Sequence, residues 1–167
     1  MDQPVVLFLL RAIHIGVGVF WVGSVLLATF YLRPASRDTG AAGGELLREI
    51  MLRRKLHVHL IWAGWVTILA GVGLYMRNMS LSHGAWARTP MGIGISIGAL
   101  AAFLGLMVDM IANGPATRRI ALASQPGAAP LSEADSASLA RRLWVGTVTV
   151  TVLLALAVVT MATARYY

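Results

Sequence analysis

The chain alternates between four long apolar stretches and shorter polar connections. The apolar stretches run from about residue 4 to 32, 56 to 76, 91 to 112 and 143 to 164. Crossing the hydrocarbon core of a bilayer takes about 20 helical residues, so each stretch is long enough to span a membrane. Backbone polar groups must be satisfied within a lipid-exposed segment, which favours helices. The pattern therefore predicts an all-α polytopic membrane protein, with one four-helix transmembrane domain over residues 1–167 in an up-down bundle.

The composition supports a chain that lies almost entirely within the membrane. Mean hydropathy is +0.72, 57% of the 167 residues are hydrophobic and only 13% are charged. An average soluble domain is about 25% charged. The four stretches leave no room for a separate soluble domain. Because the chain contains no cysteine, disulfides, thiolate metal sites and thiol catalysis are excluded.

The net charge of +7 belongs to the connections rather than to a nucleic-acid-binding surface. Cytoplasmic connections are enriched in Lys and Arg, so we expect the first and third connections to be cytoplasmic and both termini to lie outside the cytoplasm. The first stretch is too long for the apolar region of a signal peptide and is expected to be retained. The basic residues of the first connection are Arg33, Arg37, Arg48, Arg53, Arg54 and Lys55, and those of the third are Arg118, Arg119, Arg141 and Arg142.

Four small residues in the third stretch share one helix face. Gly94, Gly98, Ala101 and Gly105 recur at intervals of three or four residues. Such faces let helix backbones approach closely in membranes, so we expect this one to pack against another helix. The alternative is a flat cofactor that lies against the glycines.

Two segments of the connections carry local structural signals. Glu45–Lys55 is amphipathic and is expected to extend the second membrane helix into the cytoplasm. Ser132, followed by Glu133 and Asp135, is typical of a helix N-terminus with a capping hydroxyl and an acidic first turn. We expect the helix that begins there to continue into the fourth stretch.

An ionisable residue lies within the first stretch, where it is energetically costly and therefore a candidate functional residue. His14 shares one helix face with Arg11, Gly18 and Trp21. In a haem site, His14 would bind the iron and Gly18 would make room for the porphyrin. Arg11 would neutralise a propionate and Trp21 would pack on the ring. The alternative is that Arg11 extends towards the interface and His14 forms a hydrogen bond to a neighbouring helix.

A second polar group lies towards the cytoplasmic side. It consists of His57, His59 and Asp109, which the antiparallel order of the helices brings to similar depth. We expect at most one of the two histidines to face the interior beside Asp109, and we favour His59 because it lies deeper. The group is either a structural ion pair or hydrogen bond, or a proton-handling or metal-binding cluster. The candidate metal ligands of the chain are thus His14, His57, His59 and Asp109.

Depth separates the two histidine sites. His14 and His59 differ by about 20 Å along the bundle axis, which is too far for both to bind one haem iron. A second ligand for a haem on His14 must then come from the outer half of the protein. His83 is the candidate in the outer connection, and Met79 and Met91 are weaker options.

The first helix resembles that of a group of small bacterial membrane proteins. The residues that carry the resemblance are Arg11-x-x-His14-x6-Trp21-x-Gly23, then Arg33-Pro34-Ala35, with similar patterns at Ala70-Gly71-Val-Gly73-Leu-Tyr75 and Asn113-Gly114-Pro115-Ala-x-Arg118. The group includes the copper-resistance D-type domain, the membrane domain of urate-oxidase-like proteins and the small membrane protein that replaces protoporphyrinogen oxidase in haem synthesis. The resemblance implies a helical bundle in the bacterial plasma membrane that binds haem b through His14, with Arg11 and Trp21 alongside.

These observations lead to one principal hypothesis and two alternatives. The principal one is a cytochrome-like protein that binds haem b and transfers electrons between a quinone, or another redox partner, and a further subunit. The first alternative is a cofactor-free accessory subunit of a larger membrane complex, or a homo-oligomer held by its glycine faces. The second is a copper or proton transporter using His57, His59 and Asp109, although the chain has no inverted repeat. No nucleophile–base or carboxylate constellation is present, which disfavours catalysis by this chain alone. Whether the chain is an enzyme is left open.

Overall fold

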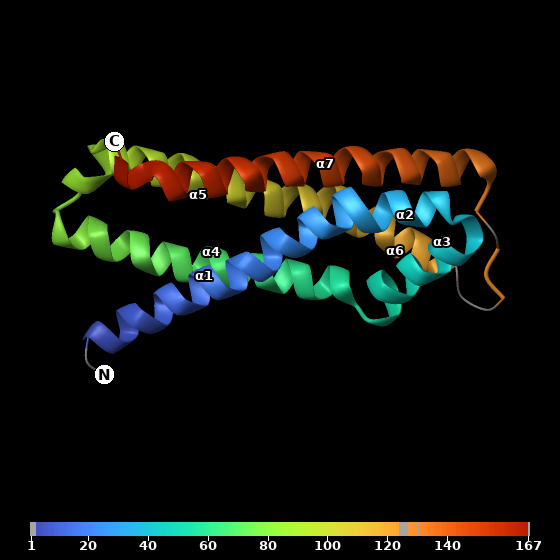
Figure 1. Cartoon of the computed structure of the whole chain (residues 1–167), viewed down its shortest axis with the longest axis horizontal. Helices are drawn as coiled ribbons and strands as arrows, with labels where there is room; N and C mark the ends of the chain where they lie inside the picture. The colour runs from blue at the N-terminus through green and yellow to red at the C-terminus, as the bar shows by residue number, and fades with distance from the viewer. Residues whose placement is uncertain (1–2, 124–126, 130, 167) are drawn as a thin grey trace.

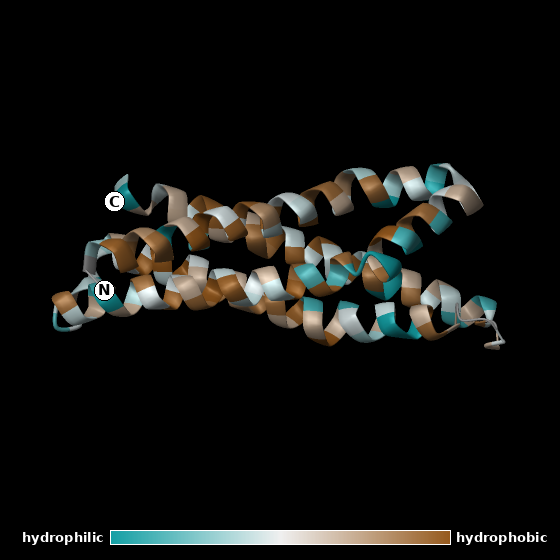
Figure 2. Cartoon of the chain, turned by 90° about the horizontal axis from the view of Figure 1, so that it is seen from below, coloured by the Kyte–Doolittle hydropathy of each residue, from teal (hydrophilic) through white to brown (hydrophobic). Residues whose placement is uncertain are grey.

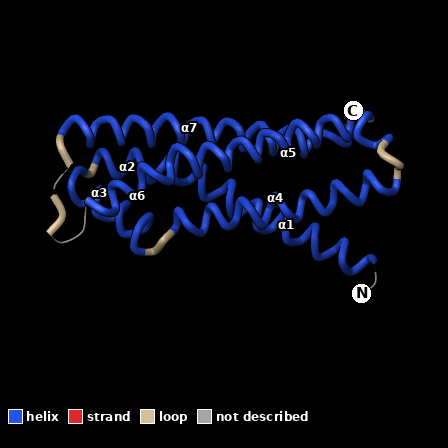
Figure 3. The backbone as a smooth tube through the Cα atoms, turned by 180° about the vertical axis from the view of Figure 1, so that it is seen from behind, coloured by secondary structure: helices blue, strands red, loops and turns tan. Residues whose placement is uncertain are grey.

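The computed structural model describes residues 3–123, 127–129 and 131–166. These residues are almost entirely helical, and no strand occurs among them (Figure 3). Four helical segments are long and apolar enough to cross a membrane: Pro4–Asp38, Leu56–Leu81, Pro90–Ala123 and Glu133–Tyr166. The all-α fold with four membrane-spanning helices is therefore confirmed. The first, third and fourth segments extend beyond the expected apolar stretches, into the first and third connections, which are rich in Arg and Lys.

The spans are built from the following elements. The first comprises α1 (Gln3–Leu27), the π-helical η1 (Ala28–Leu32) and α2 (Arg33–Asp38), after which come α3 (Gly40–Arg48) and the π-helical η2 (Glu49–Arg53). The second is α4 (Leu56–Leu81), followed by the short 3₁₀ helix η3 (Ala85–Arg88). The third comprises α5 (Pro90–Val108), the π-helical η4 (Asp109–Asn113) and α6 (Gly114–Ala123). The fourth is α7 (Glu133–Thr163), which ends in the 3₁₀ turn η5 (Ala164–Tyr166).

The helices form two close pairs, α1 with α4 and α5 with α7 (Figure 1). We call the end that carries α2, α3, α6 and the start of α7 the basic end. The opposite end, where both termini lie, is the terminal end. The pairs meet in a core whose central side chains are Trp21, Leu106, Val150 and Leu154, each at most 2% exposed. Hydroxyl contacts also join the pairs, between Thr29 and Thr151 at 2.9 Å and between Tyr75 of α4 and Ser96 of α5 at 3.0 Å.

Many large apolar side chains of the spans are exposed, and Figure 2 shows hydrophobic residues along the length of the spans. Phe8, Val19, Trp62 and Leu100 are each about half exposed or more. A membrane supplies the apolar surroundings that such a surface needs. The first span is the least covered: only 6% of its most apolar window is buried, against 28–33% for the other three.

The small-residue face of α5 packs against α7, as expected. Gly94 lies against Ala164, Gly98 against Met161 and Thr160, and Gly105 against Leu153 and Leu154. Because α7 covers this face, there is no room for a flat cofactor against the glycines.

The first connection differs from the prediction. Glu45–Lys55 does not extend the second membrane helix, because Lys55 adopts the left-handed conformation with φ 56° and separates η2 from α4. The segment instead follows α2 after a turn at Thr39 and Gly40. It packs against α2 and the start of the second span at the basic end. Glycine suits this turn because Gly40 has φ +60°.

The start of the fourth helix matches the prediction. The Ser132 hydroxyl accepts a hydrogen bond from the backbone N–H of Asp135 at 3.1 Å, and α7 then continues without a break to Thr163. Asp135 also forms an ion pair with Arg119 of α6 at 3.1 Å. The cap and this ion pair fix the direction in which α7 enters the bundle.

The α5–α7 contact predicts that Gly98→Ala destabilises the protein. The new Cβ would lie 2.7 Å from the Met161 Cγ and 3.1 Å from the Ala157 carbonyl oxygen. Overpacking of this kind costs about 1–3 kcal/mol. Gly16→Ala is the matched control, because nothing lies within 4 Å of its new Cβ. Unfolding of both variants in mixed micelles measures the difference, and equal stabilities would contradict the close α5–α7 contact.

Candidate functional site

His14 lies in the interface between α1 and α4. The two helices run antiparallel, with Leu10 opposite Gly73, His14 opposite Gly71 and Trp21 opposite Gly64. A Cβ on Gly71 would lie 2.8 Å from the Cε1 of the His14 ring, so the ring fits only because residue 71 has no side chain. The imidazole is partly buried.

One ring nitrogen of His14 is held by α4. Nδ1 donates a hydrogen bond to the backbone carbonyl oxygen of Thr67 at 2.8 Å. Because a carbonyl can only accept, the proton of the neutral ring lies on Nδ1 and the lone pair lies on Nε2. Nε2 has no hydrogen-bond partner among the residues described and is not buried. The arrangement contains the expected hydrogen bond to a neighbouring helix, and it leaves one nitrogen available as a ligand.

The other residues on the helix-one face do not gather around that nitrogen. Gly18 faces Thr67, whose Cγ2 would lie 3.3 Å from a Cβ at residue 18. Trp21 is 2% exposed and packs against Gly64 in the core. Gly18 and Trp21 therefore both contact α4 in this arrangement, and their expected contacts with a porphyrin stay a prediction. Arg11 is exposed on α1, one turn nearer the terminal end than His14.

No second protein ligand lies near His14 in the described ranges. His83 follows the end of α4, 12 residues beyond Gly71, which corresponds to about 18 Å along the helix axis. His83 is also exposed, with a left-handed φ of 50°. Met79 lies about 12 Å beyond Gly71, and Met91 begins α5 at the terminal end. None of these three residues can bind the same iron as His14 within one chain.

The helix register also separates the two histidine regions as expected. His59 lies 12 residues before Gly71 on α4, or about 18 Å towards the basic end. His14 and His59 therefore cannot bind one iron.

A cavity of about 240 Å³ lies at the basic end of the bundle. Its walls are mostly apolar and come from α1, α3, α4, α7 and the π-helical segments. Its polar lining includes Arg33, His57, Asp109, Asn113 and Thr147. The cavity thus collects ionisable groups from three of the four spans, which makes it the second candidate site.

Three π-helical segments meet at this cavity. η1 contributes Ala28 and leads directly into Arg33, η2 contributes Met51 and Leu52, and η4 contributes Asp109 and Asn113. A π-helical turn shifts the phase of the helix that follows it, and such turns are frequent at functional sites. The deviations from α-helical geometry thus concentrate around one cavity.

Hydrogen bonds fix part of the polar lining. The Asn113 amide donates to one carboxylate oxygen of Asp109 at 2.8 Å. The Asn113 carbonyl oxygen lies where a side chain at residue 146 would be, 2.2 Å from a Cβ placed on Gly146. His57 donates from Nδ1 to the backbone carbonyl of Met51.

The two neighbouring histidines are oriented opposite to the prediction. His57 lines the cavity with Asp109, whereas His59 is exposed. The expectation that His59 faces the interior is therefore wrong. The reason is the break at Lys55, which sets the rotation of α4 so that His57, Leu60 and Ile61 share the inner face.

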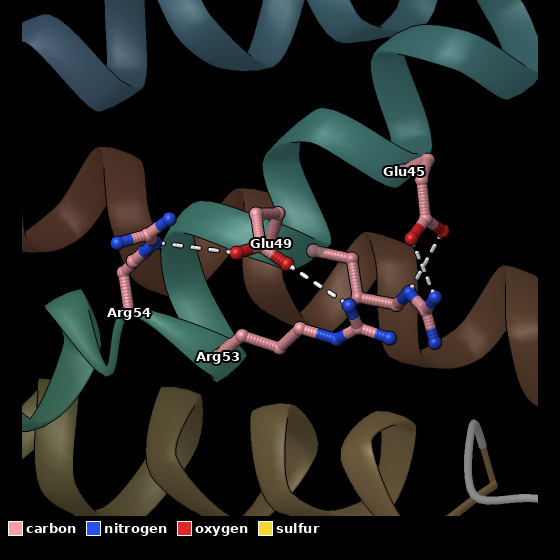
Figure 4. A network of polar contacts seen from close by, with 5 residues as sticks. Glu45, Glu49, Arg53 and Arg54 are labelled. Carbon is pink, nitrogen blue, oxygen red and sulfur yellow. Dashed lines mark hydrogen bonds and ion pairs between the residues drawn. The ribbon is translucent and has the colours of Figure 1, made fainter.

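The segment α3–η2 covers one side of the cavity and carries its own ion pairs. Glu45 accepts two hydrogen bonds from Arg48, at 2.6 and 3.0 Å, and Glu49 pairs with both Arg53 and Arg54 (Figure 4). The hydrogen bond from Arg48 lowers the pKa of Glu45. Leu47, Met51 and Leu52 of the same segment line the cavity. The segment thus turns mostly apolar side chains to the cavity, although Arg48 also contributes to the lining.

The candidate metal ligands do not form a metal centre. Within the described part of the chain, no three His, Asp or Glu side chains gather closely enough to hold a metal ion. His57 and Asp109 share the cavity, His59 is exposed, and His14 lies in the α1–α4 interface nearer the terminal end.

Sequence reasoning did not assign Arg33, Asn113 and Thr147 to this site. In the sequence, Arg33 is a basic residue of the first connection and Arg33 and Asn113 belong to the patterns that carry the resemblance, whereas Thr147 carries no signal of its own. A polar residue near the end of each of three apolar spans was the available signal. Their convergence depends on the π-helical turns, which the apolar pattern does not reveal.

The Asn113–Gly146 contact predicts a rescue experiment. Gly146→Ala places a methyl group against the Asn113 amide and is expected to destabilise the protein by about 1–3 kcal/mol. Asn113→Ala in the same chain removes the clash, so the double variant should be more stable than the sum of the two single changes predicts. Unfolding in mixed micelles measures the coupling. Additive effects would show that the two residues do not touch.

Comparisons with known proteins add no family assignment. Searches of family models, curated proteins and solved structures found no match to this chain. Function must therefore be inferred from the arrangement of the residues themselves, at His14 and in the basic-end cavity.

Proposed function

We propose that this membrane protein binds haem b through the Nε2 of His14 and transfers electrons to or from a redox partner in the membrane. The observation that carries the proposal is the hydrogen bond from His14 Nδ1 to the Thr67 carbonyl oxygen. Histidines that bind metals commonly donate their other ring N–H to a carbonyl, which fixes the tautomer and aims the free nitrogen. When bound, haem supplies the one-electron chemistry.

Two contacts orient the side chain of His14, the proposed iron ligand. Thr67 holds the ring nitrogen, and the bare backbone at Gly71 sets how closely the ring approaches α4. Both contacts come from one helix, so His14 is held before any cofactor arrives. Such preorganisation supports a role as a ligand.

The second axial ligand of this proposal belongs to another chain. His14 Nε2 is not buried, and α1 is the least covered span. We therefore place the haem at a contact between α1 and a second copy of the chain or another membrane subunit. Arg11, exposed on the same face one turn away, is the residue suited to a propionate.

One observation favours the cofactor-free accessory subunit as a second candidate. Gly18 and Trp21, which a haem within the chain would need, are taken up by packing on α4. In this alternative the His14–Thr67 hydrogen bond is only structural, and the exposed face of α1 contacts partner helices directly.

We also propose a bacterial plasma-membrane location with the basic end in the cytoplasm and both termini outside it. The support is the concentration of Lys and Arg at the basic end, since cytoplasmic loops carry the excess of these residues. On this orientation the cavity opens towards the cytoplasmic half of the membrane, and His14 lies in the outer half.

Absorption spectroscopy tests the haem proposal. The protein purified in mild detergent should give sharp reduced-minus-oxidised α and Soret bands of a b-type haem, quantified as pyridine haemochrome. His14→Ala should lose these bands, whereas His59→Ala should keep them because His59 is exposed and remote from His14. Full haem content in His14→Ala, or none in well-folded wild-type protein purified with its partners, would reject the proposal.

Gly71→Ala tests the orientation of the ligand without removing it. The added methyl group would lie 2.8 Å from the His14 ring and should displace it, lowering haem occupancy or shifting the bands. Gly16→Ala, on α1 two residues from His14, should leave the spectrum unchanged because its new Cβ meets no atom within 4 Å. Identical spectra for both variants would contradict a site at the α1–α4 interface.

The lack of cysteine makes the orientation directly testable. Single cysteines at the exposed positions Asp38, at the basic end, and Arg88, at the terminal end, can be labelled with a membrane-impermeant maleimide in spheroplasts. The cysteine at residue 88 should react in intact spheroplasts and that at residue 38 only after lysis. The reverse pattern would invert the proposed orientation.

A further inference from the structure

The basic-end cavity is separate from the His14 site and has its own polar chemistry. It reaches up the bundle as far as Val25 and Ile61, and Ile61 lies ten residues, or about 15 Å, from Gly71 along α4. The haem proposal uses none of its residues. Its function therefore requires a separate explanation.

Arg33 is the least satisfied charged residue of the cavity. Its guanidinium forms no hydrogen bond or ion pair within the described segments, and its Nε is buried without a partner. Arginine remains charged under all ordinary conditions, so it cannot avoid this cost by losing its proton. A buried donor without a partner is costly, which indicates that an acceptor oxygen joins Arg33 in the functional state.

Asp109 supplies the opposite charge without touching Arg33. One of its oxygens accepts from Asn113, and its carboxylate interacts with Arg33 and His57 only through the electrostatic field. Arg33 and Asp109 thus place opposite charges on one cavity, and the further lining residue Arg48 is already paired with Glu45. A molecule that offers an acceptor to Arg33 and a donor to Asp109 would bridge them while carrying no net charge itself.

A third polar group and the walls define the rest of the ligand. The Thr147 hydroxyl is buried without a partner on the α7 side. Most other lining side chains are aliphatic, including Leu60, Leu143 and Val150. A cavity of about 150 Å³ accommodates a benzene ring, so 240 Å³ has room for a ring with oxygen substituents.

We propose that the basic-end cavity binds the head group of an uncharged ring compound with carbonyl or hydroxyl oxygens, of the quinone–quinol class. A ring oxygen accepts from Arg33, a second oxygen meets Thr147, and a hydroxyl of the quinol form donates to Asp109. The apolar ring lies against Leu60 and Val150. Amphipathic rings prefer the boundary between lipid and water, which is where the charged end of this bundle lies.

Other occupants fit the cavity less well. A phosphate or carboxylate would meet Asp109 as well as Arg33, which opposes full anions. A metal cation would meet Arg33, and no cluster of three ligands exists among the residues placed by the structure. Water alone would have to contact the aliphatic side chains of the walls, where it finds few hydrogen-bond partners.

The test is the binding of decylubiquinone and its quinol to detergent-purified protein, followed as the rise in the thermal unfolding midpoint with ligand concentration. Wild-type protein should show a saturable rise. Arg33→Gln should weaken binding of both forms at least about tenfold, the loss expected for a charge-assisted hydrogen bond. Asp109→Asn should weaken binding of the quinol by a similar factor and leave binding of the quinone nearly unchanged, because only the quinol has a hydroxyl that donates a hydrogen bond to Asp109.

Matched controls keep the proposal falsifiable. Arg37→Gln and Asp38→Asn change the same residue types at exposed positions of α2 and should bind like wild type. Thr117→Leu fills the cavity while keeping both charges, so it should abolish binding even if Arg33→Gln fails to fold. No saturable rise in wild type, equal binding in the Arg33 and Arg37 variants, or unchanged binding in Thr117→Leu would overturn the proposal. Displacement of the quinone by phosphatidylethanolamine would also overturn it, since the site would then belong to a lipid head group.

The result can be separated from the fate of the haem proposal. His14→Ala should bind the quinol as wild type does, because His14 lies outside the cavity. Loss of haem with retained quinol binding would support both proposals. If the purified protein contains no haem but binds quinol, and only the cavity variants lose this binding, the result would support the cavity proposal and reject the haem proposal.

Discussion

The absence of a side chain at Gly64 is the constraint on which the bundle depends. Trp21 of α1 and Leu106 of α5 meet α4 at this glycine, where a Cβ would lie 2.8 Å from the Leu106 Cδ1 and 3.0 Å from the indole ring. Lipid provides no hydrophobic drive for helices to associate, so close packing at small residues must hold them together. The same device recurs at Gly71 under His14 and at Gly98 under α7, and it joins the two helix pairs into one core.

The spans and their main contacts were predictable because they follow from composition and helical period. The apolar lengths gave the four spans, the spacing of Gly94, Gly98 and Gly105 gave the face that α7 covers, and Ser132 gave the start of α7. These signals are local or depend on a single helix. They did not require knowledge of which helices become neighbours.

The candidate sites were less predictable because they depend on helix phase. The left-handed Lys55 and the π-helical turns decide that His57, rather than His59, faces Asp109, and that Arg33 and Asn113 enter the same cavity. A helical-wheel argument assumes a constant period and fails at such turns. For His14 the structure contains the expected hydrogen bond to a neighbouring helix, through Nδ1, whereas its role as a haem ligand stays a prediction.

The sparse covering of α1 has a consequence for biogenesis. Of these four spans, α1 leaves the ribosome before the others, has the least surface buried by the rest of the protein and packs mainly on α4, which follows it in the chain. It can therefore reside in lipid until α4 arrives. Of the four, α7 is made after the others and supplies Val150 and Leu154 to the core, so the glycine face of α5 is exposed to lipid until α7 inserts. The half-made protein is thus a hairpin followed by an unpaired helix, and the order of synthesis matches the order in which the helices find partners.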